Sequence, residues 1–218
     1  MTRTLLLTAA AAAALSLAAC NKPAAQGNTA DVAANNSMNP GQSTPVNAAQ
    51  DTAGAVVGAM SASTLGSHDT GAFVENAGQS DMYEIQAAKI AEEKAKAPDV
   101  KAFAKQMVTD HTAMEGQMKP LITAAGKTPP ADLDQRRKGF LDNLRAASPQ
   151  DFDKTYIDQQ VAAHDEALTL MKGYADHGDD AGLKAAAGKA VPKIQMHRDK
   201  AKALQAKLSG QPTGNSTS

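Results

Sequence analysis

Apolar side chains recur between residues 72 and 208 with the spacing of α-helices. Along residues 98–125 the seam positions lie alternately four and three residues apart, as in packed helices. The same spacing returns at residues 157–171 and 183–208. The seam positions are Val100, Ala104, Met107, His111, Met114, Met118 and Leu121; then Ile157, Val161, His164, Leu168 and Met171; then Leu183, Ala187, Ala190, Ile194, His197, Ala201, Leu204 and Leu208. The pattern predicts long helices that each bury one face.

Proline, glycine and capping residues mark where these helices begin and end. Pro98 stands at an opening helical position, Gly126 and the prolines after it end the second helix, and Ser148 opens a later one as a cap. The expected helices are residues 72–97, 98–125, 134–147, 149–177 and 183–208. Short links within each pair of long helices predict an all-α fold, an antiparallel four-helix bundle with one short extra helix.

The composition narrows the classes of protein that fit. Among 218 residues there are no Trp, four Phe and three Tyr. The core must therefore consist mostly of Ala, Leu, Ile, Val and Met, which favours helices over a β-sandwich or barrel. Lys+Arg 22 against Asp+Glu 23 give no basic excess, so we expect no nucleic-acid partner. The single Cys excludes an internal disulfide framework and a zinc site built from several cysteines.

The first twenty residues have the order of a bacterial lipoprotein signal. Arg3 precedes an apolar run over residues 5–19, which is too short to span a bilayer as a helix, and small residues lead up to Cys20. We therefore predict a signal peptide over residues 1–19 and a lipid on Cys20 that anchors the protein to a membrane. Asn21 stands where inner-membrane lipoproteins tend to have Asp. This points to the outer membrane of a bacterial cell envelope, facing the periplasm.

The lipidated cysteine begins a long polar segment, residues 20–70. From residue 21 on it is rich in Ala, Asn, Gly, Ser and Thr, with four charged residues and no aromatic residue. Segments of this kind bury too little apolar surface to fold. We therefore predict a flexible linker between the lipid and a domain over residues 71–208. Residues 209–218 are uncharged and polar, and are expected to be a disordered tail.

Three of the long helices each carry one histidine on the buried seam, His111, His164 and His197. In an antiparallel pair, two residues lie at equal height when the mean of their numbers falls on the turn. The mean of 164 and 197 falls in the turn that follows residue 177, and Glu84 is level with His111 across the turn near Pro98. We therefore expect one Glu and three His in a single central layer.

Such a layer fits two kinds of site. In the first, the histidines belong to a buried polar network that fixes helix register, with Asp110 or Glu115 and Gln160 as local partners. In the second, Glu84 and the three histidines bind a transition metal, since imidazoles with a carboxylate suit zinc, iron or copper. The residue three before each His is Val or Ile and not Glu. This argues against the Glu-x-x-His pairs of di-iron enzymes.

Methionines beside the seam histidines bear on the choice of metal. Met107 and Met114 flank His111 by one turn each, and Met196 precedes His197. Thioethers suit Cu(I), and methionine also fills gaps in a core poor in aromatic residues. Both explanations stay open at this point.

The last helix is strongly basic, with seven basic residues against one acidic residue. Such a helix would dock on an anionic lipid or protein surface. The preceding long helix is rich in Asp and Glu, so the two helices would also pair with each other. The sequence contains no nucleophile elbow and no phosphate-binding Gly-rich loop. We therefore expect a non-enzymatic role.

The order of these residues resembles that of a known family. The residues that carry the resemblance are Phe73, Glu84, Ala88, Ala91, Val100, Lys101, Phe103, Ala104, Met107, Val108, Asp110, His111, Phe152, Asp153, Tyr156, Ile157, Val161, His164, Val191, Pro192, Ile194 and His197. In this order they resemble the bacterial DUF4142 family, whose domain has no known function. The resemblance covers residues 71–208 and implies a ferritin-like four-helix bundle in an envelope protein, often a lipoprotein. It also implies that Tyr156 belongs to the polar positions of the site.

Together these features predict an envelope lipoprotein with a non-enzymatic structural, stress-related or interaction role. A metal-binding bundle protein is the first alternative, and a module that docks on an anionic envelope surface is the second.

Overall fold

The computed structural model describes residues 44–210 of the chain. These residues form six α-helices and one short 3-10 helix, and no strand occurs among them. The elements are α1 Thr44–Ser63, η1 Leu65–Ser67, α2 Thr70–Lys94, α3 Pro98–Ala124, α4 Gln135–Ala146, α5 Phe152–His177 and α6 Ala181–Leu208. The all-α prediction is confirmed. The predicted signal peptide, Cys20 and all but the first two residues of the predicted tail lie outside the described residues.

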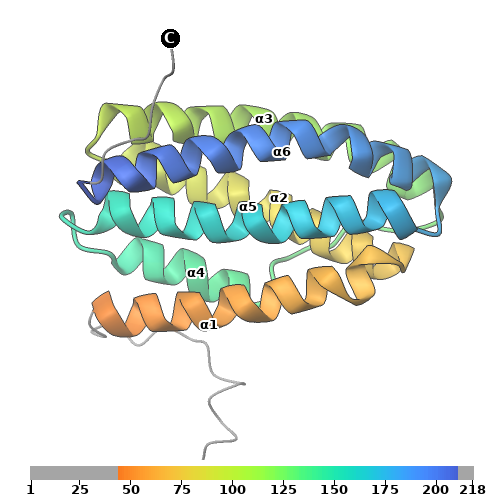
Figure 1. The fold of residues 1–218 in the computed structure, drawn as a ribbon, viewed down its shortest axis with the longest axis horizontal. Helices are drawn as coiled ribbons and strands as arrows, with labels where there is room; N and C mark the ends of the chain where they lie inside the picture. Colours follow the sequence, from red (N-terminus) through yellow and green to blue (C-terminus); the bar gives the residue numbers. More distant parts are fainter. Residues whose placement is uncertain (1–43, 211–218) are drawn as a thin grey trace, which may run out of the picture. The chain divides into compact units, whose positions relative to one another are not determined.

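Helices α2 and α3 form one hairpin and helices α5 and α6 form another, as Figure 1 shows. Asp69 caps α2 by accepting a hydrogen bond from the Ala72 amide at 2.7 Å, and Asp180 caps α6 by accepting one from the Leu183 amide at 2.8 Å. α2 ends before Pro98 because the extended backbone there donates to Asp153 of α5, from the Ala97 amide at 2.8 Å. Caps and cross-links of this kind fix where each long helix begins and ends.

The core consists of two apolar clusters, one toward each end of the long helices. The first contains Phe103 and Phe152, and the second contains Phe73 and Leu183. On α3, α5 and α6 the seam histidines fall between the residues of one cluster and those of the other. The apolar packing on both sides therefore sets the helix register at which these histidines lie.

Helix α1 lies in a stretch for which the sequence predicted a flexible linker. It packs along α5 and α4 (Figure 1), and its only charged residue, Asp51, accepts hydrogen bonds from Asn143 at 2.7 Å and Gln159 at 2.6 Å. Gly58 is buried so close to Glu166 that a Cβ atom would clash. The folded unit thus begins before residue 71, because a helix of small residues can approach its neighbours closely and needs few large apolar contacts.

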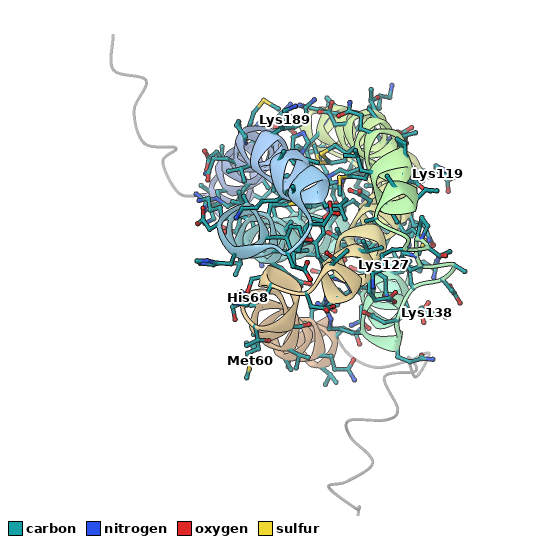
Figure 2. The ribbon with its side chains drawn as sticks, turned by 90° about the vertical axis from the view of Figure 1, so that its right-hand side faces the viewer. Met60, His68, Lys119, Lys127, Lys138 and Lys189 are labelled. Atoms are coloured by element: carbon teal, nitrogen blue, oxygen red, sulfur yellow. The ribbon has the colours of Figure 1, made fainter. Side chains whose placement is uncertain are left out.

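The larger apolar side chains of α1 point away from the core. Val56, Val57 and Met60 are 57%, 61% and 64% exposed, and in the end-on view of Figure 2 Met60 lies at the rim of the molecule.

No helix among the described residues is long and apolar enough to cross a membrane.

Candidate metal centre

The three seam histidines meet in the core between the two apolar clusters. His111 comes from α3, His164 from α5 and His197 from α6, and their exposed fractions are 3%, 1% and 0%. The ring centroids lie 5.5 to 5.7 Å apart. Each ring offers a nitrogen that lies within 4.8 Å of the nitrogens of the other two. The structure therefore brings these three side chains together, as the helix arithmetic predicted.

One nitrogen of each ring is held by an oxygen. His111 Nδ1 lies 2.8 Å from Asp81 Oδ1, His164 Nδ1 lies 2.8 Å from the Gln160 carbonyl, and His197 Nε2 lies 2.8 Å from Asp110 Oδ2. A carbonyl or an ionised carboxylate can only accept, so the ring nitrogen in each pair is the one that bears hydrogen. These contacts fix the tautomer and the orientation of all three rings.

The other nitrogen of each ring has no hydrogen-bond partner. These atoms are His111 Nε2, His164 Nε2 and His197 Nδ1, and all three are buried. In a neutral imidazole with the other nitrogen protonated, each carries a free lone pair. Each of the three helices thus contributes one buried ring nitrogen without a partner.

Burial and neighbouring charges set the protonation of the rings. Burial lowers the pKa of His164 well below its usual value, and lowers that of His197 to about 4 although Asp110 opposes this. Burial would also lower the pKa of His111, but the hydrogen bond and the charge of Asp81 outweigh it, and the pKa is raised. Two of the three rings are therefore held neutral, the form that binds metal.

Glu84 lies in the same layer but outside the group of ligand nitrogens. Its Oε1 is 3.7 Å from His164 Nδ1, the nitrogen that bonds to the Gln160 carbonyl, and its Oε2 accepts a hydrogen bond from Gln160 Nε2 at 2.6 Å. Burial raises the pKa of Glu84 to about 7, and the charge of His111 offsets this only in part. Glu84 Oε1, Gln160 Oε1 and Tyr156 Oη are buried without hydrogen-bond partners. The sequence-predicted polar residues thus gather beside the histidines.

Asp81 is the site residue that the sequence reasoning missed, and Asp110 has a different partner from the one expected. Asp81 lies on α2, one turn before Glu84, and holds His111. Asp110 is adjacent to His111 in sequence but binds His197 of α6 and also pairs with Lys193 at 2.7 Å. The available signal was the position of Asp81, one turn from Glu84 on the same inward-facing side of the helix.

The methionines near the histidines belong to the apolar core or to the surface. Met107 is part of the first apolar cluster and Met114 packs against the second, whereas Met196 is 46% exposed. Their positions match the gap-filling role of methionine. The polar atoms that hold the histidines are oxygens. Metal-binding histidines are usually held in this way, by an oxygen bonded to the ring nitrogen that does not bind the metal.

The basic side chains of α6 are mostly engaged by neighbouring helices. Arg198 and Lys202 pair with Asp165 of α5, while Lys193 and Lys207 pair with Asp110 and Asp99 of α3, respectively. Four of the seven basic side chains of α6 are thus paired with carboxylates of α3 and α5.

Comparison with known proteins places the chain in a family. The chain matches the family described as domain of unknown function (DUF4142) over residues 55–204, which is more than half of its length. Neither a curated protein nor a solved structure matches the chain. The match begins within α1 and ends in α6, so it includes every histidine of the cluster and their oxygen partners. The chain belongs to the DUF4142 family.

Proposed function

We propose that this protein binds one transition-metal ion through His111, His164 and His197. The observation that supports the proposal is the histidine cluster itself: one nitrogen of each ring lies within 4.8 Å of those of the other two, and each ring has one buried nitrogen without a hydrogen-bond partner. Every opposite ring nitrogen is held by an oxygen of Asp81, Gln160 or Asp110, the arrangement that orients histidine ligands at metal sites.

A purely structural network is the competing explanation, and the unpartnered nitrogens speak against it. A buried acceptor without a partner costs about 1–3 kcal/mol. A network selected for stability would pair these nitrogens with donors, yet the nearby buried groups without partners include two acceptor oxygens, on Glu84 and Gln160, and one hydroxyl, on Tyr156. A bound cation would remove this cost by accepting one lone pair from each ring, His111 included once that ring is neutral.

The donor set favours a metal that binds neutral imidazole. Zinc, copper and iron all do so, and three histidines leave a fourth position for water or another ligand. Magnesium and calcium prefer oxygen ligands and fit poorly. Because no nucleophile or cofactor motif accompanies the site, the proposal is one of metal binding and not of catalysis.

The experiment is metal analysis of the full-length protein, purified without a histidine tag. We expect about one zinc, copper or iron ion per chain after reconstitution, and loss of that ion in His111→Ala and His164→Ala. His68→Ala is the matched control, because His68 is exposed and stacks on His177 far from the cluster in sequence. Retention of metal in both cluster variants, or no metal above the buffer level in the parent protein, would overturn the proposal.

A thermal melt distinguishes the metal site from a network. At a free metal concentration about 100 times the Kd, binding adds about 2.7 kcal/mol, which for a domain of this size corresponds to a rise in Tm of about 5–10 °C. A network would show no metal-dependent rise, and would only lose stability when a histidine is replaced.

We further propose that the protein resides in a bacterial cell envelope, anchored through a lipid on Cys20. The order of charge, apolar run, small residues and cysteine supports this. Incorporation of a labelled fatty acid should occur in the parent chain and be abolished in Cys20→Ser. Equal labelling of both chains would contradict the anchor.

A further inference from the structure

A cavity lies away from the histidines, between α1, α4 and α5. It measures about 570 Å³, within the usual range for small-molecule sites. Apolar groups form much of its lining, including Phe140, Ala55 and Ala162. None of the three histidines or their oxygen partners lines it. A ligand bound here would therefore leave the candidate metal centre untouched.

A fixed carboxylate stands in the wall of this cavity. Asp51 Oδ1 accepts a hydrogen bond from Asn143 Nδ2 at 2.7 Å, and its Oδ2 accepts one from Gln159 Nε2 at 2.6 Å. Gln159 is held in turn, because its Oε1 accepts from the Tyr83 hydroxyl at 2.9 Å. The carboxylate is therefore positioned before any ligand arrives.

Two further acceptor atoms of the wall have no hydrogen-bond partner. Asn47 and Asn143 are nine-tenths or more buried, both line the cavity, and the Oδ1 atom of each has no hydrogen-bond partner. The amide donors of Asn143 and Gln159 are already used on Asp51. A ligand that donates hydrogen bonds would therefore satisfy the two free acceptor atoms of the wall.

The charged side chains that line the cavity also favour a cationic ligand. Three carboxylates line the cavity, from Asp51, Asp151 and Asp158, against the single ammonium of Lys154, which is itself paired with Asp158. Burial raises the pKa of Asp51 to about 6, and the charge of Asp158 adds to this, although the hydrogen bonds from Gln159 and Asn143 oppose it. A ligand cation would offset the charge of this carboxylate.

From this geometry we propose that the cavity binds a small organic cation, an ammonium group on a short apolar chain, with Asp51 as the acceptor of the ammonium. The apolar part of the ligand would pack on Phe140 and the alanines. Because a charge-assisted hydrogen bond in a partly buried site contributes about 1.5–3 kcal/mol, loss of the carboxylate charge should weaken binding by about tenfold or more.

The test is calorimetric titration of the full-length protein with n-butylamine, and with 1-butanol as the neutral compound of the same shape. We expect saturable binding of the amine, little binding of the alcohol, and at least about tenfold weaker amine binding in Asp51→Asn. Asp176→Asn is the matched control, since it removes the same charge from an exposed position of α5 outside the cavity.

A second variant keeps the test decisive if Asp51→Asn loosens α1. Ala162→Leu fills the cavity from α5 and leaves the hydrogen bonds of Asp51 in place, so it should abolish amine binding while the circular dichroism and thermal melt stay close to those of the parent protein. Equal binding of amine and alcohol, or unchanged amine binding in Ala162→Leu, would overturn the proposal, as would the absence of amine binding at millimolar concentration.

Discussion

The outer contact between Asp81 and His111 offers a sharp test of the metal proposal. We expect Asp81→Asn to weaken zinc binding by about tenfold, within the range of about 10–100-fold that outer-shell changes cause. The substituted amide keeps an oxygen that can accept from His111 Nδ1, so the ring should stay in place. The change removes the charge and leaves the shape nearly the same.

The magnitude follows from the geometry of this pair. Asp81 Oδ1 lies 2.8 Å from His111 Nδ1, and the two side chains are only 12% and 4% exposed. A hydrogen bond to a charged group contributes about 1.5–3 kcal/mol and a neutral one about 0.5–1.5 kcal/mol. The difference is about 1.4 kcal/mol, which is a factor of about ten in the Kd.

Competition against a chromogenic zinc chelator gives the Kd directly. The titration should be run at a pH above the raised pKa of His111. At a lower pH, the loss of the Asp81 charge would also lower the pKa of His111 and free its ring nitrogen for zinc, which would mask the weaker binding. Glu93→Gln is the control, an exposed carboxylate on the same helix. If Asp81→Asn binds zinc as tightly as the parent protein and Glu93→Gln, the outer-shell reasoning is refuted.

Three further predictions concern the fold and its charges. Leu183→Ala should lower the free energy of unfolding by about 2–5 kcal/mol in urea titrations, because Leu183 is fully buried. Leu208→Ala on the same helix is the control: Leu208 is 37% exposed, so this change should alter the free energy of unfolding by less than about 0.5 kcal/mol. Glu166→Ala should cost about 1.5–3 kcal/mol, because the buried Arg137 guanidinium loses this partner and keeps only Asp134; a loss below about 1 kcal/mol would show that the pair is dispensable. Asp51 should make the fold less stable as pH rises from about 4 to about 6. Its pKa of about 6 in the folded state exceeds its ordinary value of 3.8, so the folded state holds the proton more tightly. This contribution should be largest below pH 4 and absent from Asp51→Asn, as urea titrations across this pH range would show.

Much of the fold follows from local signals in the sequence. The alternating four- and three-residue seams and the opening Pro98 place the long helices with ends that differ from the structure by at most three residues. The end of α2 differs because the backbone amides of Lys96 and Ala97, just after the helix, donate to Asp153 of another helix. Contacts of this kind join residues far apart in the chain, and no local pattern reports them.

Helix α1 was missed for a related reason. Its sequence is rich in Ala and Gly and has one charged residue, a composition that is typical of a linker. Its stability comes from the hydrogen bonds of Asp51 and the close approach at Gly58, both to residues about a hundred positions later.

The candidate site was predicted in position but only partly in chemistry. The arithmetic of antiparallel turns places the histidines at one height, because helices have a fixed rise per residue. It cannot determine which carboxylate bonds to which histidine, because the side-chain rotamers decide which oxygen reaches which ring. Thus Asp110 turns to His197, and His111 is held by Asp81 from the neighbouring helix.

The origin of the three histidines in two separate hairpins has a consequence for folding kinetics. His111 belongs to the α2–α3 hairpin, while His164 and His197 belong to the α5–α6 hairpin. Each hairpin can close on contacts between neighbouring helices, but the cluster is complete only after the two hairpins have docked. Interactions that form after the transition state slow unfolding and leave the folding rate nearly unchanged. An ion held by these rings would therefore lengthen the lifetime of the folded state without making the chain reach it any sooner.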